Sequence, residues 1–242
     1  GLPEDLMYLA FIESGYNPKA YSRSGAAGCW QFMPFTGRRF NLSVDWWMDE
    51  RRDPYKAVKA AAEYLEILHG MFGDWELAVA AYNAGEGKVS RALKASGANS
   101  FYELVQRNDT LDHKTKLRKE TLHYVPRFTA MVKIARNFAL LGFKEVDWNA
   151  APNLQAVKVP GGADLRQLAN AARMDWNEFQ HHNPAFRRET TPPARSVTVY
   201  VPVDAVASVQ RFIKSPTATS YAGYSKYTIQ RGDSWSLIGQ RF

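Results

Sequence analysis

The chain has 242 residues, of which 45% are hydrophobic and 23% are charged, and this balance excludes a collagen-like, coiled-coil or largely disordered protein. No apolar run reaches the roughly 18 residues that a membrane-spanning helix needs, and the single cysteine, Cys29, excludes an internal disulfide and a cysteine-based metal cage. Residues 1–150 carry 20 lysines and arginines against 18 acidic residues, whereas residues 151–242 carry 11 against 6. The second part is therefore basic and suited to an anionic partner such as nucleic acid, a lipid surface or an anionic polymer.

The pattern at the start of the chain predicts a helix over residues 3–14. Pro3 suits the first helical position, and Gly15 suits the position just past the end. At helical spacing, one face carries Leu6, Leu9, Ala10 and Glu13. An acidic residue therefore lies in line with an apolar stripe. The chain begins directly at this helix, so we expect its true start, with any export signal or lipid anchor, to lie upstream.

Residues 15–54 show no sustained period, and such long irregular segments in compact domains usually carry function. Helical patterns then follow one another, separated by glycines. We expect helices over residues 55–69, 75–84, 87–96, 100–107 and about 116–141, the last with Pro126 as a kink or a restart. Residues 1–148 are thus predicted to form one helical domain.

The pattern changes after residue 148. We expect strands over 155–159 and 197–203, where apolar and polar residues alternate, and helices over 164–173 and 176–182, with Asp164 and Asp175 as N-caps. These elements predict a small α+β domain of βααβ order over 149–214. A linker rich in Ser, Thr and Gly is expected over 215–226, and a strand at 227–229 with a helix from 234 would open an incomplete unit over 227–242.

Four short motifs of the helical domain stand out by their order and spacing. They are Glu13-Ser14, the sequence GCWQFMP at 28–34, the sequence AYNAG at 81–85, and Glu120-Thr121 with Tyr124-Val125. Each motif alone also has a purely structural explanation: a glutamate at the edge of a buried apolar helix face, an asparagine as a helix C-cap, or a tyrosine in the core. Together, over residues 2–140, they resemble the lytic murein transglycosylases with a soluble-transglycosylase type of catalytic domain, a family related to goose-type lysozyme. In one departure, Cys29-Trp30 stands where the family commonly has Leu-Met.

The resemblance implies a mainly α, lysozyme-like fold and a reaction on peptidoglycan. The β-1,4 bond between MurNAc and GlcNAc would be cleaved without water, which leaves 1,6-anhydromuramoyl ends. Glu13 would act as general acid and then as base, and no cofactor or metal is implied. The role of general acid suits the position of Glu13, because an apolar environment raises the pKa of a carboxyl and keeps it protonated at neutral pH. The charge at the anomeric carbon would be met by the substrate's own N-acetyl group, not by a second carboxylate.

The resemblance also implies supporting roles for eight further residues. They are Ser22 and Gln31 as hydrogen-bonding groups near the scissile bond, Phe32 and Met33 as the wall, Tyr82 as the holder of the N-acetyl group, Asn83 as a support of the cleft, and Glu120 and Tyr124 as groups that close the site from the long helix. Glu120 also suits a buried structural acceptor, and that alternative stays open.

After the helical domain, the chain resembles peptidoglycan-binding LysM modules. Residues 227–242 match the opening of one module, and residues 155–203 match more loosely, through their strand-helix-helix-strand order. For residues 155–203, a glycan-binding module and a spacer that binds nothing are weighed equally. With the stretch 45–54, this layout favours the membrane-bound, LysM-bearing members of the family. It implies a place in the periplasm or cell envelope, with outer-membrane anchoring left open.

Three other functions compete with that of a transglycosylase. A goose-type lysozyme would add water, and Asp45, Asp49 and Asp53 are the acids that would position it. A catalytically dead wall-binding protein has no chemical reason to keep Glu13 on an apolar face. A nucleic-acid binder is disfavoured because the basic residues after 150 are scattered and no base-reading motif is present. We therefore expect peptidoglycan glycan strands as the partner, no nucleic acid, and a monomer.

Overall fold

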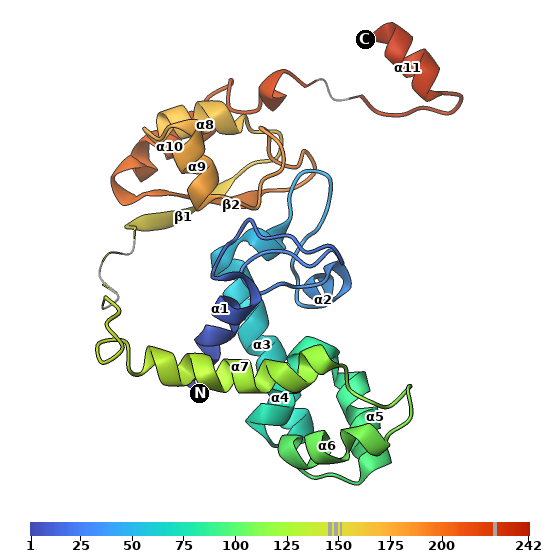
Figure 1. Cartoon of the computed structure of the whole chain (residues 1–242). Helices are drawn as coiled ribbons and strands as arrows, with labels where there is room; N and C mark the ends of the chain where they lie inside the picture. Colours follow the sequence, from blue (N-terminus) through green and yellow to red (C-terminus); the bar gives the residue numbers. More distant parts are fainter. Residues whose placement is uncertain (145–146, 148–149, 151, 225–226) are drawn as a thin grey trace. The chain divides into compact units, whose positions relative to one another are not determined.

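The computed structural model describes residues 1–144, 147, 150, 152–224 and 227–242. The chain divides into two compact units, Gly1–Ala151 and Pro152–Phe242 (Figure 1). The fold is mainly α, because the first unit is helical and the second adds a pair of strands to its helices. Within the described ranges, no helix is both long and apolar enough to cross a membrane. The boundary predicted at residue 148 falls on residues outside those ranges.

The helices of the first unit follow the predicted order, with one additional short helix at Pro34–Arg39, within residues 15–54, where the sequence shows no sustained period. They are α1 (Tyr8–Ser14), α2 (Pro34–Arg39), α3 (Pro54–Phe72), α4 (Trp75–Ala84), α5 (Glu86–Ser96), α6 (Phe101–Arg107) and α7 (Lys119–Ala135), with 3-10 turns at Glu4–Met7, Glu50–Arg52 and Asn108–Thr110. The helix predicted over residues 3–14 is split, since its first turn is 3-10. Helix α7 is shorter than predicted at both ends, and Pro126 lies inside it without ending it.

Helix α4 lies at the centre of the first unit's core. Its residues 77–81 are all buried, and it contacts α3, α5 and α7. A helix that is apolar on every side is suited to such a position. Asp74 starts α4 by accepting a hydrogen bond from the backbone N–H of Leu77. Because α1 also packs against α7, the three helices α1, α4 and α7 form one connected framework (Figure 1).

A buried arginine fixes the long connection between α1 and α3. The Arg51 guanidinium donates two hydrogen bonds to the Asp49 carboxylate, at 2.8 and 2.7 Å, and two more to the carbonyl oxygens of Gly25 and Phe32, at 2.7 and 2.8 Å. Gly28 lies so close that a Cβ there would stand 1.8 Å from the carbonyl oxygen of Arg51, and its φ is +81°. Only glycine suits this approach. The segment 25–33 is therefore held rigidly against 49–52.

The second unit has the predicted βααβ order. Strand β1 (Leu154–Val159) pairs antiparallel with β2 (Val197–Pro202), and α8 (Leu165–Ala171) and α9 (Trp176–His182) lie between them in the chain. The predicted N-caps are confirmed, because Asp164 accepts from the N–H groups of Arg166 and Gln167, and Asp175 accepts from Glu178. An additional helix, α10 (Val206–Ile213), contacts α8 and β1 and completes this unit's core.

Residues 215–224, for which the composition predicts a linker, contact the second unit. Ala218 is buried, its carbonyl oxygen accepts from the N–H of Asp164, and the Tyr221 ring packs against Gly162. Residues 225–226 lie outside the described residues. The strand predicted at 227–229 is not formed in the structure, and the helix predicted after it is α11 (Trp235–Arg241), which buries none of its residues.

Candidate active site

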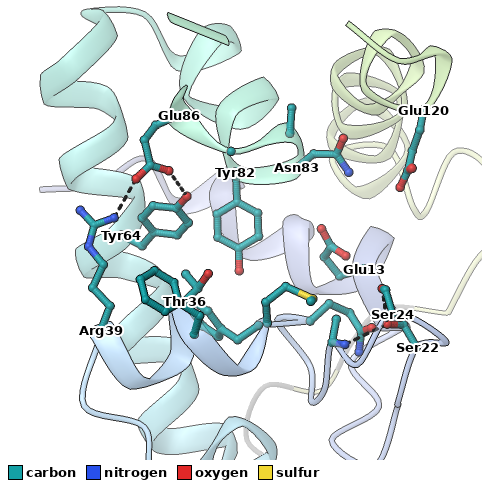
Figure 2. Close-up of a pocket in the computed structure, with 17 residues that line it drawn as sticks. Glu13, Ser22, Ser24, Thr36, Arg39, Tyr64, Tyr82, Asn83, Glu86 and Glu120 are labelled. Atoms are coloured by element: carbon teal, nitrogen blue, oxygen red, sulfur yellow. Dashed lines mark hydrogen bonds and ion pairs between the residues drawn. The ribbon is translucent and has the colours of Figure 1, made fainter. Parts of the chain in front are cut away.

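A cavity of about 560 Å³ opens in the first unit, where α1, α4 and α7 meet the segment 22–39 (Figure 2). It is lined by Glu13, Ser22, Ser24, Ala26, Gln31, Phe32, Met33, Phe35, Thr36, Arg39, Tyr64, Tyr82, Asn83, Ala84, Gly85, Glu86 and Glu120. All of the site residues predicted from the sequence line this cleft except Tyr124, whose hydroxyl is hydrogen-bonded to Glu13. Residues that are up to 107 positions apart in the sequence are thus brought to one cleft.

Glu13 lies near the end of α1 and projects into the cleft (Figure 2). Leu9 and Ala10 of the same helix are buried in the core. The Tyr124 hydroxyl donates a hydrogen bond to Glu13 Oε1 at 2.5 Å. Burial raises the pKa of Glu13 to about 7, with a further increase from the negative charge of Glu120, while the Tyr124 hydrogen bond and Arg127 act in the opposite direction. At neutral pH this carboxyl is therefore able to both donate and accept a proton.

Tyr82 and Asn83 lie in the last turn of helix α4 and line the cleft. The Tyr82 hydroxyl donates to the carbonyl oxygen of Trp30 at 2.8 Å, so its lone pairs are left to accept a hydrogen bond. Burial, together with the charge of Glu13, raises the pKa of Tyr82 well above its usual value, which keeps the hydroxyl neutral. The Thr121 hydroxyl donates to Asn83 Oδ1 at 2.8 Å, and this bond fixes the Asn83 amide at the wall of the cleft.

The segment that carries Ser22, Gln31 and Met33 forms the opposite wall. The Gln31 amide nitrogen donates to the carbonyl oxygen of Gly28 at 2.9 Å, and Ser22 Oγ accepts from the backbone N–H of Ala26 at 2.9 Å. Gln31 retains its amide oxygen as an acceptor for a ligand. Met33 is exposed, whereas Phe32 is only 2% exposed and supports the wall from within by packing on the Tyr82 ring.

The far end of the cleft holds a cluster that the sequence did not reveal. The Glu86 carboxylate accepts a hydrogen bond from the Tyr64 hydroxyl at 2.7 Å and pairs with the Arg39 guanidinium at 2.7 Å (Figure 2). Burial alone would raise the pKa of Glu86, but the bonds from Tyr64 and Arg39 lower it below its usual value. Glu86 is thus a charged structural group. Its partners lie 22 and 47 positions away, so no spacing rule predicts the cluster.

The three aspartates that the sequence suggested as groups to position a hydrolytic water do not line the cleft. Asp45 accepts from the backbone N–H groups at 47 and 48, Asp49 is paired with Arg51, and Asp53 caps α3 (Pro54–Phe72). The carboxylates that do line the cleft are Glu13, Glu86 and Glu120. In the described part of the chain, no group of three or more His, Cys, Asp or Glu side chains is arranged to hold a metal ion.

Both units of the chain are similar to known proteins. Residues 2–105 match the family described as the transglycosylase SLT domain, and residues 153–217 match the LysM-like domain of the lytic transglycosylase MltD. The chain is 29% identical over 253 aligned residues to membrane-bound lytic murein transglycosylase D of Escherichia coli (strain K12), covering 99% of this chain and 54% of that protein. The chain therefore spans about half the length of this curated relative.

Two further similarities are confined to part of the chain. The soluble lytic murein transglycosylase of Escherichia coli (strain K12) is 32% identical over 113 residues, which cover 43% of this chain and 18% of that protein. A solved structure, the complex of the 70-kDa soluble lytic transglycosylase with bulgecin A, aligns with a TM-score of 0.45 at 27% identity. The alignment covers 59% of this chain and 23% of that one.

Proposed function

We propose that this chain, which carries an SLT transglycosylase domain followed by an MltD-type LysM-like domain, cleaves the glycan strands of peptidoglycan as a lytic transglycosylase. The observation that carries the proposal is the state of Glu13. Its carboxyl lies in the cleft, is held by the Tyr124 hydroxyl, and has a pKa of about 7. A carboxyl with this pKa is suited to give a proton to a leaving group at neutral pH and to take one back.

The reaction needs one acid that serves twice. Glu13 protonates the glycosidic oxygen, and the bond between that oxygen and C1 of MurNAc breaks. The Glu13 carboxylate then accepts the proton of the 6-hydroxyl of the same MurNAc, and the oxygen of that hydroxyl forms a bond to C1. The products are a free GlcNAc hydroxyl and a 1,6-anhydromuramoyl end. No water is consumed, and Glu13 returns to its protonated form.

The substrate's own acetamido group would meet the positive charge that develops at C1. Tyr82 is placed to orient that group, because its hydroxyl proton is used by the Trp30 carbonyl and its lone pairs can accept the acetamido N–H. Asn83, fixed by Thr121, would support the same position. Ser22, Gln31 and Met33 of the opposite wall would hold the neighbouring sugars.

Hydrolysis by a lysozyme mechanism is the competing chemistry. It requires a base that positions water on the face of the sugar opposite the acid. Asp45, Asp49 and Asp53 are occupied by backbone caps and by Arg51, and none of them lines the cleft. The aspartates considered for that role therefore give hydrolysis no support, and the intramolecular attack of the 6-hydroxyl is the reaction that we propose.

Mass spectrometry of the products separates the two reactions. Purified murein is digested with the full chain, and we expect muropeptides that are lighter by one water than the corresponding lysozyme products and that resist borohydride reduction. Glu13→Gln should form these products at least about 100-fold more slowly, while Lys59→Ala, a change at an exposed residue outside the cleft, should not alter the rate. Reducible ends as the main product would refute the transglycosylase.

The proposed substrate also indicates where in the cell the protein would act. Murein lies in the cell envelope, and the relative from Escherichia coli is named as a membrane-bound enzyme, so we propose an envelope location for this chain. We further propose that it works as a monomer, because the residues assigned to the cleft all come from one unit of one chain. Size-exclusion chromatography with light scattering measures the oligomeric state directly.

A further inference from the structure

A second cavity, of about 330 Å³, adjoins the cleft and has a different chemical character. It is lined by Asn83, Ala84, Lys88, Arg91, Arg118, Glu120 and Thr121, and we call it the basic cavity. Asn83, Ala84 and Glu120 also line the cleft, so the two spaces share a wall. The basic cavity is formed by the end of α4, the exposed face of α5 and the start of α7.

Three cations are gathered in the basic cavity against one carboxylate. Among the residues that the structure describes, Lys88, Arg91 and Arg118 form no ion pair. The Lys88 ammonium donates one hydrogen bond, to the carbonyl oxygen of Lys114 at 2.8 Å, and two of its protons remain. Three positive charges around one cavity repel one another, and an anion bound between them relieves that repulsion.

We propose that the basic cavity binds a carboxylate carried by the glycan strand whose sugars occupy the cleft. This proposal rests on the proposed function. Muramic acid differs from GlcNAc by a lactyl ether, which ends either in a free carboxylate or in a short peptide with carboxylates of its own. Arg91 and Arg118 supply planar guanidinium groups that match the two oxygens of a carboxylate, and Lys88 adds a point charge.

The shared wall explains how one ligand reaches both spaces. A sugar seated beside Asn83 would lie next to the opening of the basic cavity, so its substituent can enter without a change in the position of the strand. The carboxylate of Glu120 stands on that wall and repels an anion, which directs a bound carboxylate towards the three cations. The basic cavity would thus select strands with anionic muramic acid over uncharged strands of GlcNAc.

The test compares substrates that differ only in charge. Murein strands bearing peptides and strands freed of peptides are each used as they are and after carbodiimide-catalysed amidation of their carboxylates. For the wild-type chain, we expect a KM about tenfold lower on the untreated strands, as two or three exposed ion pairs would give. In the double variant Arg91→Ala/Arg118→Ala, this difference should shrink to about twofold or less.

A matched control removes the same net charge elsewhere in the first unit. Lys59→Ala/Lys94→Ala changes two exposed lysines that do not line either cavity, and it should keep the tenfold difference in KM. If KM differs between untreated and amidated strands that carry no peptide, the ligand of the basic cavity is the lactyl carboxylate. If KM differs only for peptide-bearing strands, the ligand is a carboxylate of the peptide. Equal KM values for untreated and amidated strands, or equal effects of the two double variants, would overturn the proposal.

A binding measurement distinguishes a failure of the basic-cavity proposal from a failure of the proposed function. Calorimetric titration of the Glu13→Gln variant with untreated and amidated strands measures the contribution of the carboxylates without any reaction. If the wild-type chain cleaves no strand but Glu13→Gln prefers untreated strands, and loses that preference with Arg91→Ala/Arg118→Ala, the function fails and the basic cavity stands. If cleavage occurs and the calorimetric preference is missing, only the inference about the basic cavity fails.

Discussion

Replacing Glu13 by glutamine should make the protein more stable at neutral pH while it removes the acid. Glutamine keeps the size of the side chain and an oxygen that accepts from Tyr124, but it carries no charge. The folded state holds the Glu13 pKa at about 7 against a usual value of 4.5, so the folded state binds the proton more tightly than the unfolded state. This preference corresponds to at most about 3 kcal/mol, because each pH unit is worth about 1.4 kcal/mol.

The sign of the pH dependence follows from this preference. Below pH 4.5 the carboxyl is protonated in both states, and the wild-type chain and Glu13→Gln should have similar stability. Between pH 4.5 and about 7 the unfolded chain loses this proton while the folded chain keeps it, so the stability of the wild type falls relative to the variant and levels off above pH 7. At pH 8 the free energy of unfolding of Glu13→Gln should exceed that of the wild type by up to about 3 kcal/mol.

Urea denaturation of both proteins at pH 4, 6 and 8 measures this difference. For a unit of this size, each kcal/mol also corresponds to about 2–4 °C in Tm, so thermal scans provide an independent measure. Glu66→Gln, at an exposed position of α3, is the control for a generic loss of charge. A stability difference between Glu13→Gln and the wild type that stays constant from pH 4 to pH 8 would refute the buried acid and the argument built on it.

Three further predictions follow from the same contacts. Tyr124→Phe removes the hydrogen bond that lowers the pKa of Glu13, so the alkaline limb of the pH profile of kcat/KM should move to higher pH, and kcat should fall about tenfold. An alkaline limb at the same pH as in the wild type would contradict the hydrogen bond between Tyr124 and Glu13. Gly28→Ala should lower the free energy of unfolding by at least about 2 kcal/mol because its Cβ meets the Arg51 carbonyl, whereas Gly70→Ala, with open space around it, should not destabilise the fold. In pull-downs on insoluble murein, residues 1–151 should be retained less than the full chain at low salt, and equal retention at every salt concentration would favour a spacer role for residues 152–242.

The helices could be predicted from the sequence because their signals are local. Asp53 and Asp74 are N-caps, Gly73 and Gly97 end helices in the left-handed conformation, and the apolar residues follow a period of 3.6 between them. The βααβ order was predicted for the same reason, since Asp164 and Asp175 cap the two short helices.

Elements whose stability comes from distant contacts could not be predicted in this way. The Ser- and Thr-rich composition of residues 215–224 predicts a linker, but composition does not reveal that the Ala218 carbonyl pairs with Asp164 or that the Tyr221 ring lies on Gly162. The prediction of a strand at 227–229 was wrong. A short strand is stable only when a neighbouring strand pairs with it, and the alternation of residues in this segment does not show whether such a neighbour exists.

The same distinction applies to the cleft. The position of Glu13 on an apolar face is a local pattern, and it indicates an acid with a raised pKa. The cluster of Arg39, Tyr64 and Glu86 comes from three different helices, and each residue alone looks like an ordinary surface or core position.

The hydrogen bond between Tyr124 and Glu13 joins residues that are 111 positions apart, and Thr121 holds Asn83 across 38 positions. Both donors belong to α7, the last helix of the first unit, so during synthesis the cleft is completed only when this helix has left the ribosome and docked. Until then Glu13 is surrounded by water, and a solvated glutamate is ionised at neutral pH and cannot protonate a leaving group. On the proposed function, a nascent or partly unfolded chain would therefore not cleave murein, because its Glu13 is ionised and its cleft is incomplete.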